Sequence, residues 1–485
     1  MIVSIGKWKN DLLPNHIRRG QSETVLRYLI IYLLIHQSAS AGERPDILVI
    51  IGSDQGWGDL SIQGSKDVET PNLDVLGESG IELKRFYATP IGATTRASLL
   101  TGRYHYRTGA SGDTNGEHVM NSFETTIGEL FQKSGYRTGF FGEWENGANW
   151  PHCAKAQGFA VGEEVNSEKV REFFRRNEDE EPGFAIVSCE GFLEADALIG
   201  ELEAIVKSEN TVLFYLSDNG PTIEKGKRFN AYLYGERGSV HEGGVRVPCL
   251  VSWPGKIPAG SHFDRITTVI DVFPTLAEIA GLQPSEEVEL DGKNLLPVLE
   301  SGGKPRRWPN RILFTSSTPP GFDLKNAAVS VRTDRWLTVR DAKWCRDEGK
   351  AAEFNGWELY DLVADPFEKY NVSTDYPFLI SDMKADFSFW MDQTTRFELK
   401  NIPTEIGHPE WPLVTLRAGD RDAMGMWSVK VVNEGNYQIR LESGDGGTIE
   451  LSGEAKTVPG NFVLKSGEFE ISTKAESDLI IEPAD

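Results

Sequence analysis

From residue 45 onward, short apolar runs alternate with longer amphipathic stretches, and this alternation leaves few folds open to the chain. Five runs are rich in β-branched or aromatic residues, as are strands buried on both faces of a parallel sheet. They span 46–54, 136–142, 183–189, 211–218 and 248–254. Apolar residues recur at helical spacing in 124–134, 192–209 and 268–281. The pattern predicts an α/β sandwich around a mainly parallel sheet, with right-handed crossovers.

The pattern changes twice after this region. The segment around 358–372 predicts a small subdomain of strands and helices, and antiparallel β structure is expected from about residue 411. Alternating residues on either side of 433–436 predict a hairpin turn. We therefore expect an α/β domain, a small α+β subdomain and an appended β-sandwich module, at 42–310, 311–400 and 411–485.

Residues 25–41 have the layout of a secretory signal peptide. Arg27 precedes a short apolar run that ends in the small residues 39–41. The polar residues 1–24 carry no pattern, which favours a true start near Val25. No segment reaches the ~20 apolar residues of a membrane span. We expect 1–41 to be removed and the protein to be exported, to a periplasm or outside the cell, with no stable membrane span left.

The chain is strongly acidic, with 50 Lys and Arg against 73 Asp and Glu and a formal net charge of −23. Such a surface argues against nucleic acids and anionic membranes as partners, so any site for an anionic group must be local. The four cysteines form no C-x-x-C pair and indicate no metal site. Their spacing, at Cys153, Cys189, Cys249 and Cys345, leaves one or two disulfides open without selecting a pairing.

Two predicted strands end in residues that bind hard cations. Asp54 follows the first strand, and Asp218 and Asn219 follow the run at 211–218. Ligands of open α/β sheets bind beyond the carboxyl ends of the strands, so these oxygens could converge on one cation. An Asp at a strand end is also a common turn or capping residue. The residues alone leave both interpretations open.

Seven blocks of the sequence occur in an order that belongs to one enzyme family. They include "PDILVIIGSDQGWGDL", "TRASLLTGRYHYRTG", "TTIGELFQKSGYRTGFFGEWENG", "LSDNG", "YGERGSVHEGGVRVPCLVSWPG", "IDVFPTLAEIAG" and "WELYDLVADPFE". On these blocks, residues 45–400 resemble the sulfatases, arylsulfatase-like hydrolases of the alkaline phosphatase superfamily. The resemblance implies the α/β sandwich of that superfamily, with a small C-terminal subdomain.

The resemblance also implies a nucleophile that this chain lacks. Sulfatases of this kind convert a Cys or Ser, four residues before the arginine of a C/S-x-P-x-R motif, to formylglycine, whose hydrate attacks sulfur. Here the motif arginine is Arg96, so the nucleophile position is Gly92 and the proline position is Thr94. Glycine has no side chain to oxidise, and we expect no formylglycine.

The family's calcium ligands are only partly present. An Asp pair, the formylglycine and an Asp-Asn pair hold the metal in the family. The matching positions here are Ser53-Asp54, Gly92 and Asp218-Asn219. A hard divalent ion takes six or more oxygens and gains affinity with ligand charge. We expect either a weak calcium site at Asp54, Asp218 and Asn219, or a site without metal held by hydrogen bonds of Ser53 and Asn219.

The family's sulfate clamp is reversed in charge. Its G-K-W-H-x-G pattern, whose Lys and His hold the sulfate, reads "GEWENG" here, with Glu143 and Glu145 at the two positions. A like-charge pair at 4 Å costs about 4 kcal/mol at an effective dielectric of ~20. A further lysine falls at Arg237 and keeps its charge, whereas the histidine expected after the third strand is absent. The sequence therefore predicts poor sulfate binding.

The two arginines have two interpretations. In an active enzyme, Arg96 and Arg237 would orient the nucleophile loop and the sulfate. The alternative is an internal salt-bridge network with acidic side chains, namely Asp54, Asp218, Glu143 and Glu145. His105 and His241 fall at family positions that are not catalytic, and we expect structural roles for both.

Two functions remain open. The joint loss of nucleophile, lysine and histidines predicts a non-catalytic homologue that binds glycans, sulfated or not, or another partner. The alternative is a metal-dependent sulfate or phosphate ester hydrolase that uses Thr94 or Thr95 as nucleophile. A hydroxyl nucleophile needs an activating metal or base, and neither is evident near these threonines.

Overall fold

The structure is a computed structural model. It describes residues 44–113, 116–175, 181–208, 210–223, 229–285, 288–317, 327–395, 402–422, 424–443 and 447–484. The predicted signal peptide at 1–41, including 1–24, lies outside the described residues. Residues Pro45–Asp485 form one structural unit. Within the described ranges, no helix has the length and apolar character needed to cross a membrane.

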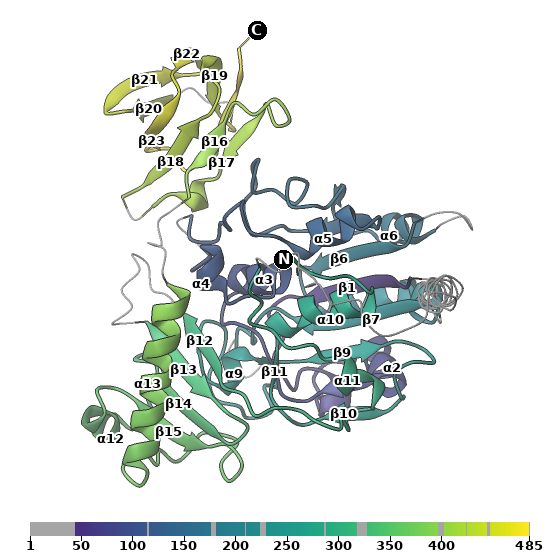
Figure 1. The fold of residues 1–485 in the computed structure, drawn as a ribbon. Helices are drawn as coiled ribbons and strands as arrows, with labels where there is room; N and C mark the ends of the chain where they lie inside the picture. Colours follow the sequence, from purple (N-terminus) through teal and green to yellow (C-terminus); the bar gives the residue numbers. More distant parts are fainter. Residues whose placement is uncertain are drawn as a thin grey trace, which may run out of the picture. The chain divides into compact units, whose positions relative to one another are not determined.

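An eight-stranded sheet lies at the centre of the α/β part, in the order β10-β2-β9-β7-β1-β6-β4-β5 (Figure 1). The five predicted strands are present as β1 (Asp46–Gly52), β4 (Arg137–Gly142), β6 (Gly183–Cys189), β7 (Thr211–Ser217) and β9 (Cys249–Ser252). The shorter strands are β2 (Ile81–Leu83), β5 (Val161–Glu163) and β10 (Ser261–Phe263). β1 is parallel to both β6 and β7, with Ile47 opposite Phe184 and Val212.

One predicted strand runs in the other direction. β9 is antiparallel to β7, with Phe214 opposite Val251. A parallel neighbour needs a crossover connection, usually a helix. The described residues of the connection between β7 and β9 form only the four-residue helix α9 (Glu242–Val245) and the two-residue strand β8 (Arg246–Val247). A fully apolar run looks the same in either direction, so the sequence did not reveal the reversal.

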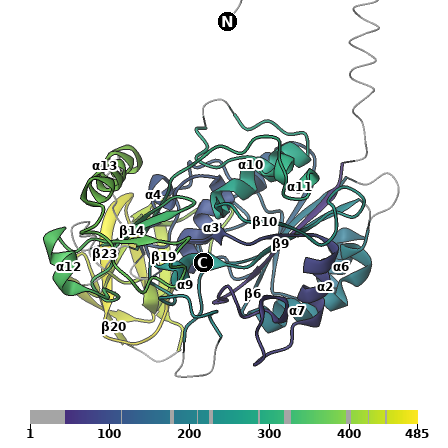
Figure 2. The same ribbon diagram turned by 90° about the horizontal axis from the view of Figure 1, so that it is seen from below.

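Helices cover both faces of this sheet (Figure 2). Ile47, Val49 and Ile51 of β1 pack into a core that includes α3 (Gly92–Thr101), α5 (Ile127–Lys133) and α10 (Val272–Ile279). Leu48 and Ile50 pack into the core on the opposite face, with α2 (Pro71–Ser79), α6 (Ser167–Phe174) and α7 (Phe192–Glu201). Burial on both faces explains why β1 is apolar at nearly every position.

Short elements complete this part. The helices are η1 (Ser61–Gln63), α4 (His105–Thr108), α8 (Glu203–Val206), η2 (Val269–Asp271) and α11 (Leu296–Glu300). β3 (Phe86–Tyr87) pairs with β8 and with β11 (Thr267–Thr268) in a second, three-stranded sheet. The predicted helix at 268–281 is thus divided into η2 and α10, which ends before Gly281.

The small subdomain expected at 311–400 is an antiparallel sheet covered by a long helix. Its strands are β12 (Leu313–Ser317), β13 (Ala328–Arg332), β14 (Trp336–Arg340) and β15 (Glu358–Asp361), in that order. Ile380, Met383 and Phe387 of α13 (Pro377–Thr394) pack on this sheet together with Val329 and Val331. α12 (Glu348–Glu353) precedes β15.

The C-terminal β module consists of two sheets that share one apolar core. One contains β16 (Thr404–Ile406), β18 (Met426–Val431), β23 (Gly467–Thr473), β20 (Gly447–Leu451) and β21 (Glu454–Val458). The other contains β17 (Val414–Leu416), β24 (Leu479–Pro483), β19 (Gly435–Leu441) and β22 (Gly460–Leu464). A 3-10 helix, η3 (Ala418–Asp420), lies between β17 and β18. The module begins before the expected boundary at 411, because β16 pairs with β18.

The hairpin predicted around 433–436 is wrong. β18 pairs with β16 and β23, whereas β19 pairs with β22 and β24 in the other sheet. The connection therefore crosses between the two sheets. Alternating burial is the same for neighbours in one sheet and for strands in two facing sheets, so the pattern did not distinguish them.

Candidate functional site

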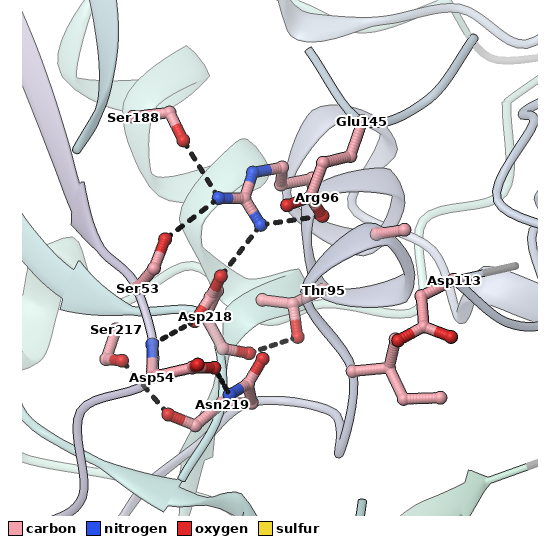
Figure 3. Close-up of polar contacts among 12 residues, drawn as sticks. Ser53, Asp54, Thr95, Arg96, Asp113, Glu145, Ser188, Ser217, Asp218 and Asn219 are labelled. Atoms are coloured by element: carbon pink, nitrogen blue, oxygen red, sulfur yellow. Dashed lines mark hydrogen bonds and ion pairs between the residues drawn. The ribbon is translucent and has the colours of Figure 1, made fainter. Parts of the chain in front are cut away.

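The polar residues predicted at the strand ends meet at the carboxyl edge of the large sheet (Figure 3). Ser53 and Asp54 follow β1, and Asp218 and Asn219 follow β7. α3 begins at Gly92 and places Arg96 against them. Glu145, one of the two glutamates at the predicted clamp positions, approaches from the segment after β4. The fold thus unites positions that are more than 160 residues apart in sequence.

Arg96 is the centre of this cluster and is only 2% exposed. Its Nη1 donates to Asp218 Oδ2 at 2.8 Å and to Glu145 Oε2 at 3.0 Å. Its Nη2 donates to Ser188 Oγ at 2.8 Å and contacts Ser53 Oγ at 3.4 Å. The guanidinium is thus held by two carboxylates and two hydroxyls.

The charges of this cluster depend on one another. Burial by itself lowers the pKa of Arg96, but the Glu145 and Asp218 carboxylates outweigh burial and raise the pKa. Burial raises the pKa of Glu145; Arg96 opposes this shift, and the like charges of Asp218 and Glu143 reinforce it. Arg96 is therefore a permanent buried cation, and Glu145 accepts a proton more readily than an exposed glutamate.

Gly92 opens the space that the guanidinium uses. A β-carbon at Gly92 would stand 2.7 Å from Arg96 Nη1 and 2.9 Å from both Asp218 Oδ2 and Glu145 Oε2. Real β-carbons essentially never come this close to another heavy atom. Any larger residue at position 92 would therefore have to displace the ion pairs of Arg96.

The described residues do not fit a calcium ion. Asp218 Oδ1 accepts the Asp54 backbone N–H at 3.0 Å, and its Oδ2 is bound to Arg96. Asn219 turns its amide nitrogen to Asp54 Oδ1 at 2.7 Å, which leaves its buried amide oxygen without a partner. Among the described residues, no group of three or more His, Cys, Asp or Glu side chains is placed to hold a metal. A divalent ion would have to compete with a guanidinium for Asp218.

Thr94 and Thr95 lie within the first turn of α3 and are buried, at 1% and 0% exposure. Thr95 Oγ1 donates to the Asp218 carbonyl at 2.6 Å, and Thr94 Oγ1 donates to the Ile91 carbonyl at 2.9 Å. Both hydroxyls also contact Thr89 Oγ1, at 2.5 and 2.7 Å. These bonds anchor the helix start, and none of them involves a carboxylate or imidazole base.

The other predicted charged residues have different partners. Arg237 is partly exposed, with Nε 3.5 Å from Asp54 Oδ1 and Nη2 3.4 Å from Asp113 Oδ2. Glu143 pairs with Arg417 of the β module at 3.8 Å, not with Arg96. The salt-bridge interpretation therefore describes the contacts of Arg96 and Arg237, but Glu143 is not part of either pair.

A cleft of about 1150 Å³ lies over Arg96 and is lined by residues that follow β4, β5 and β6. Trp144 of its wall donates its indole N–H to the His152 carbonyl at 2.9 Å. The β module contributes Trp411 and Arg417 to the same wall. Six glutamates line the cleft, against three cations. The glutamates are Glu143, Glu145, Glu163, Glu164, Glu190 and Glu194, and the cations are Arg96, Lys155 and Arg417.

Sequence reasoning missed several residues of this site. Ser188 is the second-last residue of β6, at the same sheet edge as Asp54 and Asp218, so its place near a strand end could have pointed to it. Nothing in the sequence pointed to Trp411 and Arg417, because they reach the cleft only through the way the β module packs against the α/β part. Asn149 anchors that module: its Nδ2 donates to the Thr415 carbonyl at 2.9 Å, and its Oδ1 accepts the Thr415 N–H at 3.2 Å.

The two histidines lie away from Arg96 and have buried partners. His105 contacts the Ala110 carbonyl through Nδ1 at 2.8 Å, and burial lowers its pKa to about 4. His241 is fully buried and bonds through Nδ1 to Glu368. The four cysteines, all described, are free, so the disulfides left open by the sequence are not formed.

Family models and relatives agree on what this chain is similar to. The model described as Sulfatase matches residues 45–185 and 166–282, and that described as N-sulphoglucosamine sulphohydrolase, C-terminal, matches 232–388. The chain is 27% identical to human N-acetylgalactosamine-6-sulfatase over 355 residues, which cover 55% of this chain and 67% of that protein. It is 25% identical to human arylsulfatase A over 445 residues, with 70% of this chain and 85% of that protein covered.

Solved structures share the fold. A crystal structure of Ps i-CgsB in complex with k-i-k-neocarrahexaose superposes with a TM-score of 0.64 at 23% identity, covering 74% of this chain and 95% of that one. The PsFucS1 sulfatase from Pseudoalteromonas sp. gives a TM-score of 0.60 at 20% identity, covering 79% and 96%. At these identities the similarity establishes the architecture of the chain.

Proposed function

The chain belongs to the sulfatase family, and we propose that it is a non-hydrolytic member that binds glycans in its cleft. One observation carries this proposal. At the position of the family's nucleophile, Gly92 has no side chain, and the guanidinium of Arg96 lies 2.7 Å from where its β-carbon would be. A nucleophile oxygen therefore has no atom to carry it, and a side chain at this position would have to displace the ends of the Arg96, Asp218 and Glu145 side chains.

The charge of the cleft supports the same conclusion. Catalysis of sulfate transfer requires cationic groups around the negative charge of the reacting sulfate. Here Arg96 is already paired with Asp218 and Glu145, and glutamates occupy both clamp positions. Two like charges 4 Å apart repel each other by about 4 kcal/mol at an effective dielectric of 20. The glutamates at the clamp positions therefore repel a sulfate ester.

Glycan binding is supported by the shape and lining of the cleft. Its volume of about 1150 Å³ suits an oligosaccharide more than a small ion. Trp411 offers an aromatic surface from the β module, and glutamate oxygens accept hydrogen bonds from sugar hydroxyls. The names of relatives and structural neighbours refer to glycan substrates, among them N-acetylgalactosamine-6-sulfatase and the neocarrahexaose complex.

The experiment measures hydrolysis and binding on the same sample. Residues 42–485 are tested with an aryl sulfate and an aryl phosphate, and then with a panel of neutral and sulfated oligosaccharides by calorimetry. We expect no turnover, and binding of a neutral glycan that weakens at least tenfold in Trp411→Ala. Phe389→Ala, an exposed aromatic on α13 outside the cleft lining, is the matched control and should bind like the unaltered protein.

The alternative hypothesis, a hydrolase with Thr94 or Thr95 as nucleophile, predicts that an ester is hydrolysed. It requires turnover of one aryl ester that disappears in Thr94→Ala or Thr95→Ala and persists in Phe389→Ala. That result would replace the present proposal. The hydroxyls of Thr94 and Thr95 are buried and donate to backbone carbonyls, which favours the non-hydrolytic proposal.

A further inference from the structure

We propose that the protein has a second glycan site, a basic pocket at the far edge of the large sheet that binds sulfated oligosaccharides. The pocket lies between β10 and the loop that follows α11, and its volume is about 730 Å³. We define the basic pocket by His262, Arg265, Lys304, Arg306, Arg307 and Trp308, all of which line it. The acidic cleft adjoins β4, β5 and β6, whereas β10 ends the sheet on the other side (Figure 1).

The pocket concentrates free positive charge in an acidic protein. Lys304, Arg306 and Arg307 are exposed, and no described acidic side chain forms an ion pair with any of them. The acidic residue in the lining is Asp264, which lies 3.5 Å from His262. In a chain of formal charge −23, three neighbouring cations that have no acidic partner among the described residues make this pocket a local anion site.

The loop that carries these cations is fixed on the sheet. Gly303 donates to the Val298 carbonyl at 2.9 Å and has φ 81°, and a β-carbon there would lie 1.9 Å from the His262 carbonyl oxygen. The loop therefore touches β10 at a point where only glycine fits. The Trp308 ring packs edge-on against Phe263, with centroids 5.6 Å apart.

Arg265 fastens the end of the loop. Its Nη1 donates to the Trp308 carbonyl at 2.8 Å, and its Nη2 donates to Asn310 Oδ1 at 2.7 Å and to Asp334 Oδ2 at 2.6 Å. Arg265 is thus a positioning residue whose charge is neutralised by Asp334. With both ends held, Arg306 and Arg307 leave the backbone at fixed points, which lowers the ordering cost of binding.

The chemistry of the pocket selects sulfate groups on a sugar. Guanidinium groups bind planar pairs of oxygens on sulfate or phosphate through parallel N–H donors. Trp308 also lines the pocket, and its buried indole N–H has no hydrogen-bond partner among the described residues. A long, uniformly charged polymer such as nucleic acid would also face the acidic remainder of the protein, which disfavours it. A short glycan with separated sulfates contacts the basic pocket alone.

This inference rests on the glycan-binding part of the proposed function but not on the absence of hydrolysis. The test measures binding of a heparin-derived hexasaccharide, and of its desulfated counterpart, by calorimetry at two salt concentrations. Arg306→Gln/Arg307→Gln removes two charges from the pocket. Lys465→Gln/Lys474→Gln removes two charges from the β module and is the matched control. All four residues are exposed, so we expect both variants to fold, and thermal unfolding checks this.

We expect the sulfated hexasaccharide to bind the basic pocket and the desulfated one not to bind there. The pocket variant should lose at least tenfold in affinity for the sulfated hexasaccharide, while the control variant retains it. The affinity should fall with salt, and less steeply in the pocket variant. Equal affinity in the two variants would overturn the inference. Equal binding of an oligonucleotide or an acidic peptide of the same charge would overturn its assignment to glycans. Trp411→Ala should leave this binding unchanged, so failure here is distinct from failure of the cleft proposal.

Discussion

Arg96 Nη1 lies 2.7 Å from the point where a β-carbon on Gly92 would stand. The two residues are four positions apart on α3, so they share one face of the helix. Side chains in a helix point back towards its N-terminus, which carries the guanidinium of Arg96 over residue 92. The absence of a side chain at Gly92 and the buried position of the Arg96 cation are therefore two aspects of one arrangement.

Restoring a nucleophile precursor at position 92 should not restore activity. We expect Gly92→Cys to lower the free energy of unfolding by about 1–3 kcal/mol, because the new side chain overlaps Arg96, Asp218 and Glu145. Urea unfolding measures the loss, and an aryl sulfate assay in formylglycine-producing cells measures activity. Gly162→Cys is the control, since nothing lies within 4 Å of its β-carbon position. Sulfate ester hydrolysis by Gly92→Cys would contradict this view of the site.

Removing the guanidinium should open the site to a metal. Arg96→Gln leaves Asp218 and Glu145 without a counter-charge, and we expect a loss of about 3–5 kcal/mol in stability. Calcium should recover part of it, seen as a rise in Tm that the unaltered protein does not show. Arg237→Gln, whose pairs are partly exposed, should cost at most about 1 kcal/mol.

The calcium titration of the unaltered protein is decisive even if Arg96→Gln fails to fold. A calcium-dependent rise in its Tm would mean that Asp54, Asp218 and Asn219 bind metal despite Arg96. A folded Arg96→Gln without any response to calcium would mean that the cluster cannot hold a divalent ion at all.

Acid should destabilise the protein through His105. Burial lowers its folded pKa from 6.5 to about 4, so the unfolded chain takes up a proton first as the pH falls. The stability that neutral His105 contributes to the folded protein is fully present above pH 6.5. It is lost as the pH falls from 6.5 to 4, with the free energy of unfolding falling by up to ~1.4 kcal/mol per pH unit. In His105→Gln this dependence should vanish. Unfolding free energies measured across this range give the difference, and a constant difference would refute the assignment.

Much of the fold followed from the sequence because burial on both faces leaves a clear pattern. The strand expected at 183–189 has those bounds in β6, and the capping box at Thr126 and Glu129 starts α5 within the helix expected at 124–134. The direction of β9 and the separation of β18 from β19 did not follow. Each depends on which strand lies alongside, and a residue pattern describes burial rather than pairing.

The sequence alone determined that the chain has the α/β fold of its family. The family resemblance also predicted that Gly92 stands at the nucleophile position and that Glu143 and Glu145 stand at the clamp positions. These conclusions need only residue identities at known positions. Only the tertiary structure decided that Arg96 turns into the space above Gly92, that Ser188 accepts a hydrogen bond from its guanidinium, and that Trp411 reaches the cleft. Each of these depends on contacts between residues far apart in sequence, and the free energy that selects such contacts comes from packing and desolvation in the assembled fold.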